Sequence, residues 1–142
     1  MDVKELIKQV VNVGSKIYKV LGSGLYKDVY AECIIYELSE IGINAERQKN
    51  MSLKYRTLEF DSAYQVDVIV EDILVVGIQP VDMPVDVYCK HIQTYAKHSN
   101  SSIGLILDFN VTDFRRGVKI IQKPSPKPVV FPMSYLKYYY DK

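Results

Sequence analysis

The chain has 142 residues, of which 48% are hydrophobic and 25% are charged, and its formal net charge is +1. This length is sufficient for one domain with a substantial core, and the composition is ordinary for a folded globular protein. Residues 1–122 hold 14 Lys and Arg against 16 Asp and Glu, whereas residues 123–142 hold 4 Lys and 1 Asp. The body therefore lacks the basic excess of a strong non-specific nucleic-acid binder.

The N-terminal segment predicts an amphipathic helix over residues 2–21, which the glycines of Gly22-Ser23-Gly24 end. Its apolar residues recur at helical spacing: Val3, Leu6, Val10, Val13, Ile17 and Val20. Charges along this segment are unlike a signal peptide or a membrane span. Cys33 and Cys89 lie in apolar segments without the spacing of a metal site or a disulfide framework. We therefore expect an intracellular protein, cytoplasmic or nuclear, with both cysteines reduced and buried.

A second helix is expected over residues 25–41, with Gly42 ending it. We expect its inward-facing residues to be Leu25, Val29, Cys33, Tyr36 and Ile41. Residues 43–60 predict short strands on either side of Arg56-Thr57. Two apolar strands follow at 63–70 and 73–79, and a tight turn at Glu71-Asp72 joins them into an antiparallel hairpin.

Pro80 and Pro84 bracket an irregular segment after the hairpin. A helix over residues 86–98 is expected next, with Asp86 at the N-cap position. A buried strand at 103–109 and a strand or short helix at 117–121 complete the pattern. This order predicts an α/β fold with a mixed sheet flanked by helices. We divide the chain into a domain of residues 1–122 and a Pro-rich and Tyr-rich C-terminal extension of residues 123–142.

Asp67 lies inside an apolar strand, where a carboxylate is costly unless another group compensates it. With the turn at residues 71–73, antiparallel pairing puts Asp67 opposite Gly77. Gly77 and Gln79 share one face of the second strand, because side chains alternate along a strand. One acid on the first strand, followed by acid, any residue and lysine on the second, is the arrangement of a metal-dependent nuclease. Here the second strand offers Gly77, Ile78 and Gln79 instead.

Four blocks in this order, GSGLYKDVY, YQVDVIVEDILVV, HIQTYAK and GLILDFN, resemble the GxxExxY family of the PD-(D/E)XK nuclease superfamily. The resemblance covers roughly residues 5–121 and implies a restriction-endonuclease-like fold. Gly24 and Tyr30 match the motif that names the family, but Lys27 stands at the position of its glutamate. Asp67 matches the acid of the first strand.

The remaining family positions also differ. Gly77 and Gln79 replace the glutamate and the lysine of the second strand, and His91 replaces a helical glutamine four residues before Tyr95. Glycine supplies no ligand for Mg²⁺, a cation that carboxylates, phosphates and water hold. Glutamine lacks the positive charge that a lysine offers a phosphate or an attacking water.

The resemblance therefore implies a pseudonuclease without a cofactor, in which Lys27, Asp67, Gly77, Gln79, His91 and Tyr95 are relic positions. We expect Lys27 to pair with Asp67 and to take the place of a metal, because a buried acid needs a partner. The chain would then act as a binding or assembly module rather than an enzyme.

Two other functions stay open. The first is an active Mg²⁺- or Mn²⁺-dependent nuclease in which Asp82 and Asp86, or Asp61, supply displaced carboxylates around Asp67. The second is a protein that binds nucleic acid without cleaving it. The face formed by His91, Tyr95 and His98 favours packing and solvation over a zinc site, because no cysteine or carboxylate of suitable spacing accompanies it.

The C-terminal extension ends in an aromatic and basic segment with four tyrosines that we expect to contact a partner: Tyr135, Tyr138, Tyr139 and Tyr140. Aromatic residues are enriched at protein interfaces, and four lysines alone give little affinity for phosphates. A protein partner or a homodimer is therefore favoured, nucleic acid comes second, and no membrane contact is expected.

Overall fold

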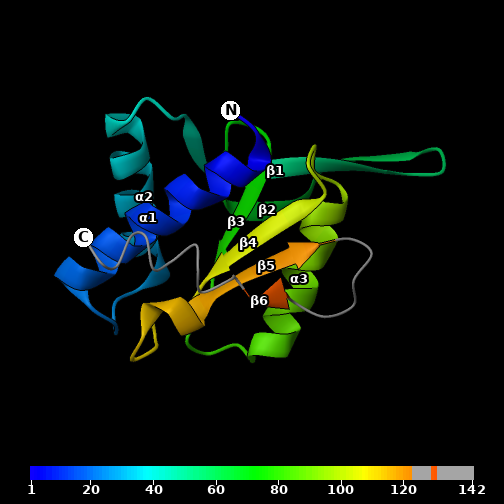
Figure 1. Cartoon of the computed structure of the whole chain (residues 1–142). Coiled ribbons are helices and arrows are strands. Elements are labelled where there is room, and N and C mark those ends of the chain that lie inside the picture. Colours follow the sequence, from blue (N-terminus) through cyan, green and yellow to red (C-terminus); the bar gives the residue numbers. More distant parts are fainter. Residues whose placement is uncertain (123–128, 131–142) are drawn as a thin grey trace.

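The computed structural model describes residues 1–122 and 129–130, and it contains a mixed sheet with helices on both faces (Figure 1). Its elements are α1 (Val3–Leu21), α2 (Lys27–Glu40), β1 (Ala45–Tyr55), β2 (Leu58–Val70), β3 (Leu74–Ile78), α3 (Val85–Lys97), β4 (Ile103–Leu107), the 3₁₀ helix η1 (Phe114–Gly117), β5 (Val118–Gln122) and β6 (Val129–Val130). The strand order is β1-β2-β3-β4-β5-β6. Only β3 and β4 pair in parallel among these strands. The predicted α/β fold with a mixed sheet flanked by helices is confirmed.

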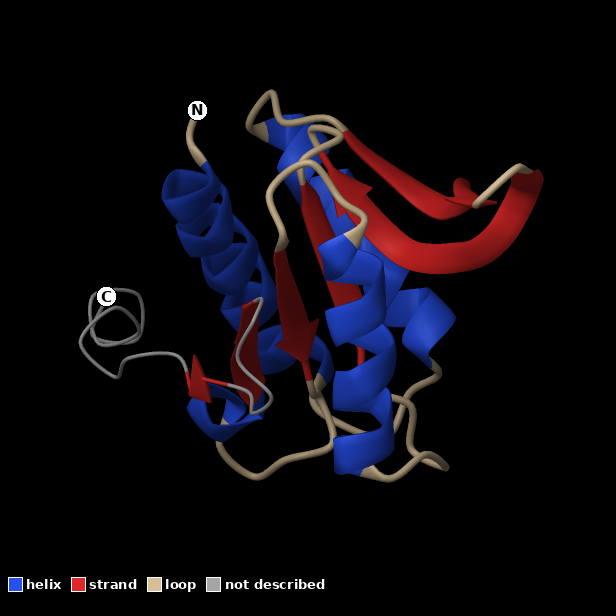
Figure 2. Cartoon of the chain, turned by 90° about the vertical axis from the view of Figure 1, so that its right-hand side faces the viewer, coloured by secondary structure: helices blue, strands red, loops and turns tan. Residues whose placement is uncertain are grey.

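The two faces of the sheet carry separate cores. On one face, α1 and α2 pack against strand residues such as Leu105 and Leu107. On the other face, α3 packs against Ile106 and Ile121 (Figure 2). Since neighbouring residues of a strand point to opposite faces, the continuous apolar run of β4 serves both cores.

The first helix begins and ends as the sequence predicts. The Asp2 carboxylate caps it by accepting a hydrogen bond from the Glu5 amide at 2.9 Å. Gly22 ends it with φ at 72°, a conformation that costs glycine little. Val20, the last of its regularly spaced apolar residues, is 77% exposed and lies away from the core. It lines a groove between α1 and α2 instead, together with Tyr36.

The predicted inward face of α2 is wrong. Of the residues expected to point inward, four are exposed and Cys33 is half-buried: Leu25, Val29, Tyr36 and Ile41 are the exposed ones. The residues that α2 buries are Tyr30, Ala31, Ile34 and Leu38. Apolar residues surround this helix, so their spacing alone does not decide which face meets the sheet.

The hairpin between β2 and β3 has the predicted register. Val70 pairs with Leu74 and Val68 with Val76, so the next position of this register sets Asp67 opposite Gly77. The expected short strands before residue 60 are wrong, because β1 and β2 are long. They join at the Arg56-Thr57 turn and form a ribbon that projects beyond the rest of the domain (Figure 1).

The third helix begins earlier than the sequence predicts. Pro84 is its N-cap residue, so the assignment of Asp86 to that position is wrong. Proline fixes the extended conformation that an N-cap residue needs before the first turn. The Asp86 carboxylate accepts a hydrogen bond from the Val87 amide at 3.0 Å. Within the described ranges, no helix combines the length and the apolar character that crossing a membrane requires.

Candidate functional site

The Asp67 carboxylate is the centre of a hydrogen-bonded group at the junction of β2, β3, α2 and α3. Its Oδ1 atom accepts from the Lys27 ammonium at 3.0 Å. Its Oδ2 atom accepts from the Tyr88 hydroxyl at 2.6 Å and from the Ile78 amide at 3.1 Å. The predicted contact between Lys27 and Asp67 is therefore present, and three donors surround one acid.

Lys27 reaches Asp67 because it is the first residue of α2. The loop before α2 is held in place by Gly24, whose amide donates to the Asn110 Oδ1 atom at 3.2 Å. Gly24 has φ at 97°, which a residue with a side chain rarely adopts. The side chain of Lys27 is 43% exposed and that of Asp67 is 19% exposed, so water screens this ion pair only in part.

Tyr30 fixes the same loop from inside the core. Its hydroxyl donates to the Gly22 carbonyl at 2.7 Å and accepts from the Leu25 amide at 3.2 Å. Its ring stacks on Phe109 with 4.0 Å between the centroids. The two motif positions that match the resembled family, Gly24 and Tyr30, thus shape the loop that delivers residue 27.

Gly77 lies at the position where the resemblance implies a second acid. Side chains of α3 fill the space that such an acid would need. A Cβ atom on Gly77 would lie 2.5 Å from Ile92 Cδ1 and 2.6 Å from the Tyr88 hydroxyl. Both distances are shorter than real Cβ contacts. Because the Tyr88 hydroxyl also bonds to Asp67, residues 67 and 77 point toward the same group.

Gln79 directs its amide into the loop that follows β3. Its Nε2 atom donates to the carbonyls of Pro80 at 3.1 Å and Met83 at 2.8 Å. The residue is only 4% exposed, and its Oε1 atom has no hydrogen-bond partner among the described residues. At the position where the resemblance implies a lysine, this chain therefore has a neutral side chain that holds a loop.

A pocket of about 430 Å³ lies beside this group, and both Lys27 and Asp82 line it. The other candidate acids, Asp61 and Asp86, are exposed. Asp61 lines a different hollow, beside the outer part of β1 and β2. Within residues 1–122 and 129–130, no three His, Cys, Asp or Glu side chains come together in a group that could hold a metal ion.

The two histidines are exposed at α3 and its C-terminal end, whereas Tyr95 packs against the sheet. His91 is exposed, with its ring centroid 6.3 Å from that of Tyr95. Tyr95 is half-buried and stacks on Tyr64 with 4.7 Å between the centroids. The ring of His98 is tilted relative to that of Tyr64, with 6.3 Å between the two centroids. The four tyrosines predicted to bind a partner, Tyr135, Tyr138, Tyr139 and Tyr140, lie outside the described residues.

Sequence reasoning did not identify Tyr88 as part of the site. It is 5% exposed, and its burial, then the charge of Asp67 and its hydrogen bond to that carboxylate, raise the pKa of its hydroxyl. A signal was available in the sequence: Tyr88 and Ile92 are four residues apart and mark the buried stripe of α3. A buried tyrosine hydroxyl needs a polar partner, and Asp67, an acid inside an apolar strand, needs hydrogen-bond donors.

The raised pKa of Tyr88 predicts a loss of stability at alkaline pH. In the unfolded chain this tyrosine ionises near its ordinary value of 10.0, whereas in the folded protein it stays protonated. Raising the pH above that value therefore favours unfolding, by up to about 1.4 kcal/mol per pH unit for one such group. Below it, the free energy of unfolding does not depend on the titration of Tyr88.

Denaturant unfolding between pH 8 and 11, on the wild type and on Tyr88→Phe, measures this effect. We expect the free energy of unfolding to fall less steeply with pH in the variant. Tyr64, whose pKa burial also raises, is present in both proteins and cancels in the comparison. Equal slopes in the two proteins would contradict the prediction.

Comparison with known proteins gives one match. The sequence model of a family described as the PD-(D/E)XK nuclease superfamily matches residues 4–121. No curated protein and no solved structure matches the chain. The match includes the loop before α2, the β2-β3 hairpin, α3 and β4, and therefore every member of the Asp67 group.

Proposed function

Since the chain belongs to the PD-(D/E)XK nuclease superfamily, we propose that it is a non-catalytic member, a degenerate relative of the GxxExxY family, that acts as a binding or assembly module. One observation carries this proposal: both oxygens of Asp67 are engaged by donors of the chain itself, Lys27, Tyr88 and the Ile78 amide. A carboxylate offers about four lone-pair sites. Three of these sites are taken, and a cation at the remaining one would lie beside the Lys27 ammonium, whose positive charge repels it.

The residues present do not fit a divalent cation. Mg²⁺ needs oxygen ligands in near-octahedral geometry and uses carboxylates together with phosphates and water. Gly77 offers no ligand, and its Cβ position is occupied by atoms of α3. The ammonium of Lys27 brings a positive charge to within 3.0 Å of Asp67, where it opposes a second cation. These contacts support the proposal that the site does not catalyse a metal-dependent reaction.

A protein partner fits the charge of the chain better than nucleic acid does. The 122 N-terminal residues hold more acids than bases, and phosphate contacts depend on clustered Lys and Arg. We propose that the tyrosines of the C-terminal extension contribute to this contact, since aromatic residues are enriched at interfaces. Removal of residues 131–142 is expected to weaken binding of the partner, and unchanged binding would contradict this role.

One observation favours an active metal-dependent nuclease as the second candidate. Asp82 lines the same pocket as Lys27, so a movement of the loop after β3 would bring a second carboxylate toward Asp67. This candidate would be established if the protein cleaves DNA or RNA in the presence of Mg²⁺ or Mn²⁺ and if Asp67→Ala abolishes the cleavage. Cleavage that survives the substitution would come from a contaminating nuclease.

Titration with Mn²⁺ by calorimetry tests the proposal without knowledge of a substrate. For the wild type we expect no stoichiometric heat of binding at millimolar Mn²⁺, because Lys27 occupies the position of a ligand. Lys27→Glu serves as the matched control, since it replaces the ammonium by a second carboxylate and should raise the affinity for Mn²⁺ above that of the wild type.

The same titration with a short oligonucleotide present checks whether a phosphate completes the site. If the wild type binds Mn²⁺ stoichiometrically, with or without the oligonucleotide, and Asp67→Asn abolishes this binding, the proposal is overturned. Absence of binding by the wild type, together with a gain in Lys27→Glu, would support it.

A further inference from the structure

A groove of about 430 Å³ lies between α1 and α2, and apolar side chains form most of its wall. Ile17, Val20 and Leu21 line it from α1, and Cys33 and Tyr36 line it from α2. Val20 is 77%, Tyr36 is 61% and Leu21 is 39% exposed, so the groove is uncovered by any described residue. Apolar side chains that gather in an exposed hollow indicate a contact surface.

The α2 wall of this groove is acidic where the helix ends. Glu37 lines the groove, and the Tyr36 hydroxyl donates to the Glu40 carboxylate, a hydrogen bond that raises the pKa of Tyr36 together with the charge of Glu40. The last turn of α2 contains no basic residue, although the partial negative charge of a helix C-terminus favours a cation there. Lys16 pairs with Glu37 at 3.0 Å, but none of the ion pairs between described residues includes Glu40. The groove therefore favours an occupant that combines apolar rings with positive charge.

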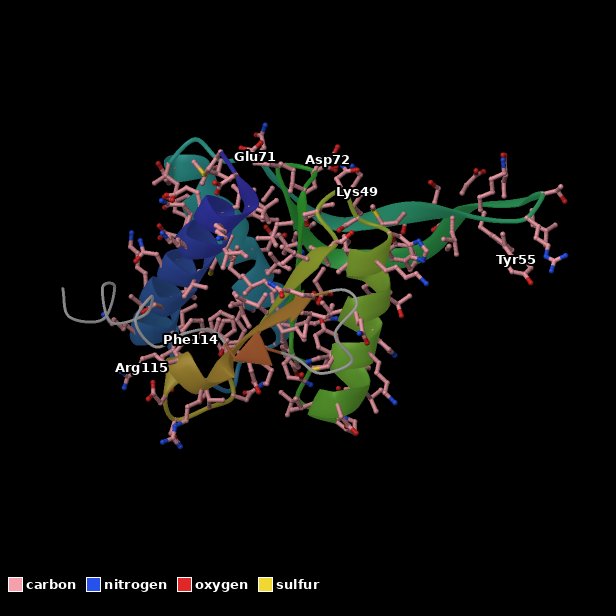
Figure 3. The ribbon with its side chains drawn as sticks, turned by 45° about the vertical axis from the view of Figure 1, so that its right-hand side comes forward. Lys49, Tyr55, Glu71, Asp72, Phe114 and Arg115 are labelled. Atoms are coloured by element: carbon pink, nitrogen blue, oxygen red, sulfur yellow. The ribbon has the colours of Figure 1, made fainter. Side chains whose placement is uncertain are left out.

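The chain itself leaves the sheet beside this groove. β6 is antiparallel to β5 and Val130 pairs with Lys119, so the strand ends near the start of β5. The 3₁₀ helix η1 immediately precedes β5, and the ring centroid of its Phe114 lies 5.5 Å from that of Tyr18 in α1. Figure 3 shows Phe114 on the side of α1, whereas Tyr55, at the tip of the β1-β2 ribbon, lies at the opposite end of the molecule. The chain therefore passes beyond Val130 next to α1 and far from the ribbon.

The sequence that follows Val130 has the composition that the groove favours. Residues 131–142 read FPMSYLKYYYDK, with four tyrosines, Lys137 and Lys142. An extended chain spans about 3.3–3.6 Å per residue, so these residues reach about 40 Å, whereas a helix with its side chains is about 10–12 Å wide. The segment is thus long enough to pass from η1 across α1 into the groove.

We propose that residues 135–142 dock in the groove between α1 and α2 of the same chain, with tyrosine rings on its apolar wall and a lysine at the C-terminal end of α2. The proposal goes beyond the binding role above, because it gives these residues a place when no partner is present. A partner that binds the tyrosines must then displace them from the groove. The proposal does not involve the Asp67 group, so it and the Mn²⁺ titration can fail separately.

Tethering makes such a contact effective even where it is weak. A short linker gives an effective concentration on the order of 1 mM, so a contact with a dissociation constant on the order of 0.1 mM is occupied about nine-tenths of the time. A group at the bottom of the groove would then be shielded about tenfold. Cys33 is such a group, because it lines the groove and is half-buried.

Alkylation of Cys33 by iodoacetamide, followed by mass spectrometry on the purified full chain, tests the proposal. The variant Tyr138→Ser with Tyr139→Ser and Tyr140→Ser should alkylate Cys33 about five to ten times faster than the wild type. Cys89 is the internal reference, because it is only 7% exposed and burial raises the pKa of its thiol. Its alkylation should stay slow in every variant that is folded, and circular dichroism confirms the fold.

Exchanges of charge test the position of the lysines. Lys137→Glu with Lys142→Glu should also speed the alkylation of Cys33, and adding Glu40→Lys should slow it again. The matched control, Lys123→Glu with Lys127→Glu, makes the same change of charge before β6 and should leave the rate within about twofold of the wild type.

Equal rates of Cys33 alkylation in the wild type and in the triple tyrosine variant would overturn the proposal. Protection of Cys33 in the wild type that disappears on dilution would also overturn it, because a second copy would then supply the segment. Protection that is independent of protein concentration and lost in the tyrosine variant would support docking within one chain. No partner is present in this measurement, so its failure would leave the binding role proposed above to be tested separately.

Discussion

Gly77→Glu, which puts a second acid opposite Asp67, is expected to destabilise the protein strongly and to leave it without a metal site. Its Cβ atom would meet Ile92 Cδ1 at 2.5 Å and the Tyr88 hydroxyl at 2.6 Å. The rest of the side chain would add a buried negative charge near Asp67. Overpacking costs about 1–3 kcal/mol, and an unpaired buried charge adds several more, so we expect a loss on the order of 4 kcal/mol or more.

Gly77→Ala isolates the steric part and keeps the test informative where the glutamate variant does not fold. We expect it to lower the free energy of unfolding by about 1–3 kcal/mol, measured by urea denaturation. The background Tyr88→Phe with Ile92→Val removes both of the closest atoms. In that background, Gly77→Ala should cost less than half as much. An equal cost in the two backgrounds would show that α3 is not what excludes a side chain at this position.

Asp67→Ala is expected to destabilise the protein far more than loss of its ion pair with Lys27 accounts for. The substitution leaves the buried Tyr88 hydroxyl and the Ile78 amide without their acceptor. Each unsatisfied buried donor costs about 1–3 kcal/mol, so we expect a loss of about 3 kcal/mol.

Lys27→Met is the matched control for Asp67→Ala, because it removes the same ion pair but leaves the Asp67 carboxylate in place. The Lys27 side chain is 43% exposed, so its loss should cost less than about 1 kcal/mol. Asp67→Ala should also lose about half of its effect in a Tyr88→Phe background, since one of the two orphaned donors is then absent. Similar costs for Lys27→Met and Asp67→Ala would mean that the ion pair, rather than the tyrosine, stabilises the acid.

The sequence predicted most of this group because its rules are local. Alternation along the strands and the length of the turn at Glu71-Asp72 set the register that puts Asp67 opposite Gly77. The pairing of Lys27 with Asp67 was expected because the family resemblance sets residue 27 at the site and because a buried acid needs a partner. Tyr88 was missed because its contact with Asp67 depends on how α3 packs across the sheet. The spacing of Tyr88 and Ile92 indicates which side of α3 is buried, but it does not indicate the hydrogen-bond partner of the Tyr88 hydroxyl.

Two other errors have the same physical origin. The face that α2 buries was wrong because apolar residues lie on all its sides, so tertiary packing alone selects Ile34 over Val29. The ribbon of β1 and β2 was read as short strands because exposed strands on both sides of Arg56-Thr57 show no buried pattern. Its alternation of Leu53, Lys54 and Tyr55 was nevertheless visible, and it marks an apolar face that nothing nearby in the sequence covers.

The hydrogen bonds of Tyr30 determine how freely the side chain at position 27 can be exchanged. They hold the backbone from Gly22 to Leu25 without any contribution from the side chain at position 27. An acidic or a basic side chain at position 27 would therefore lie beside Asp67 in the same way. One can replace the other without a change of fold. Position 77 is different, because atoms of Ile92 and Tyr88 lie where its side chain would be. Residue 27 can therefore be exchanged by a single substitution, whereas a side chain at residue 77 requires a change at Tyr88 or Ile92 as well.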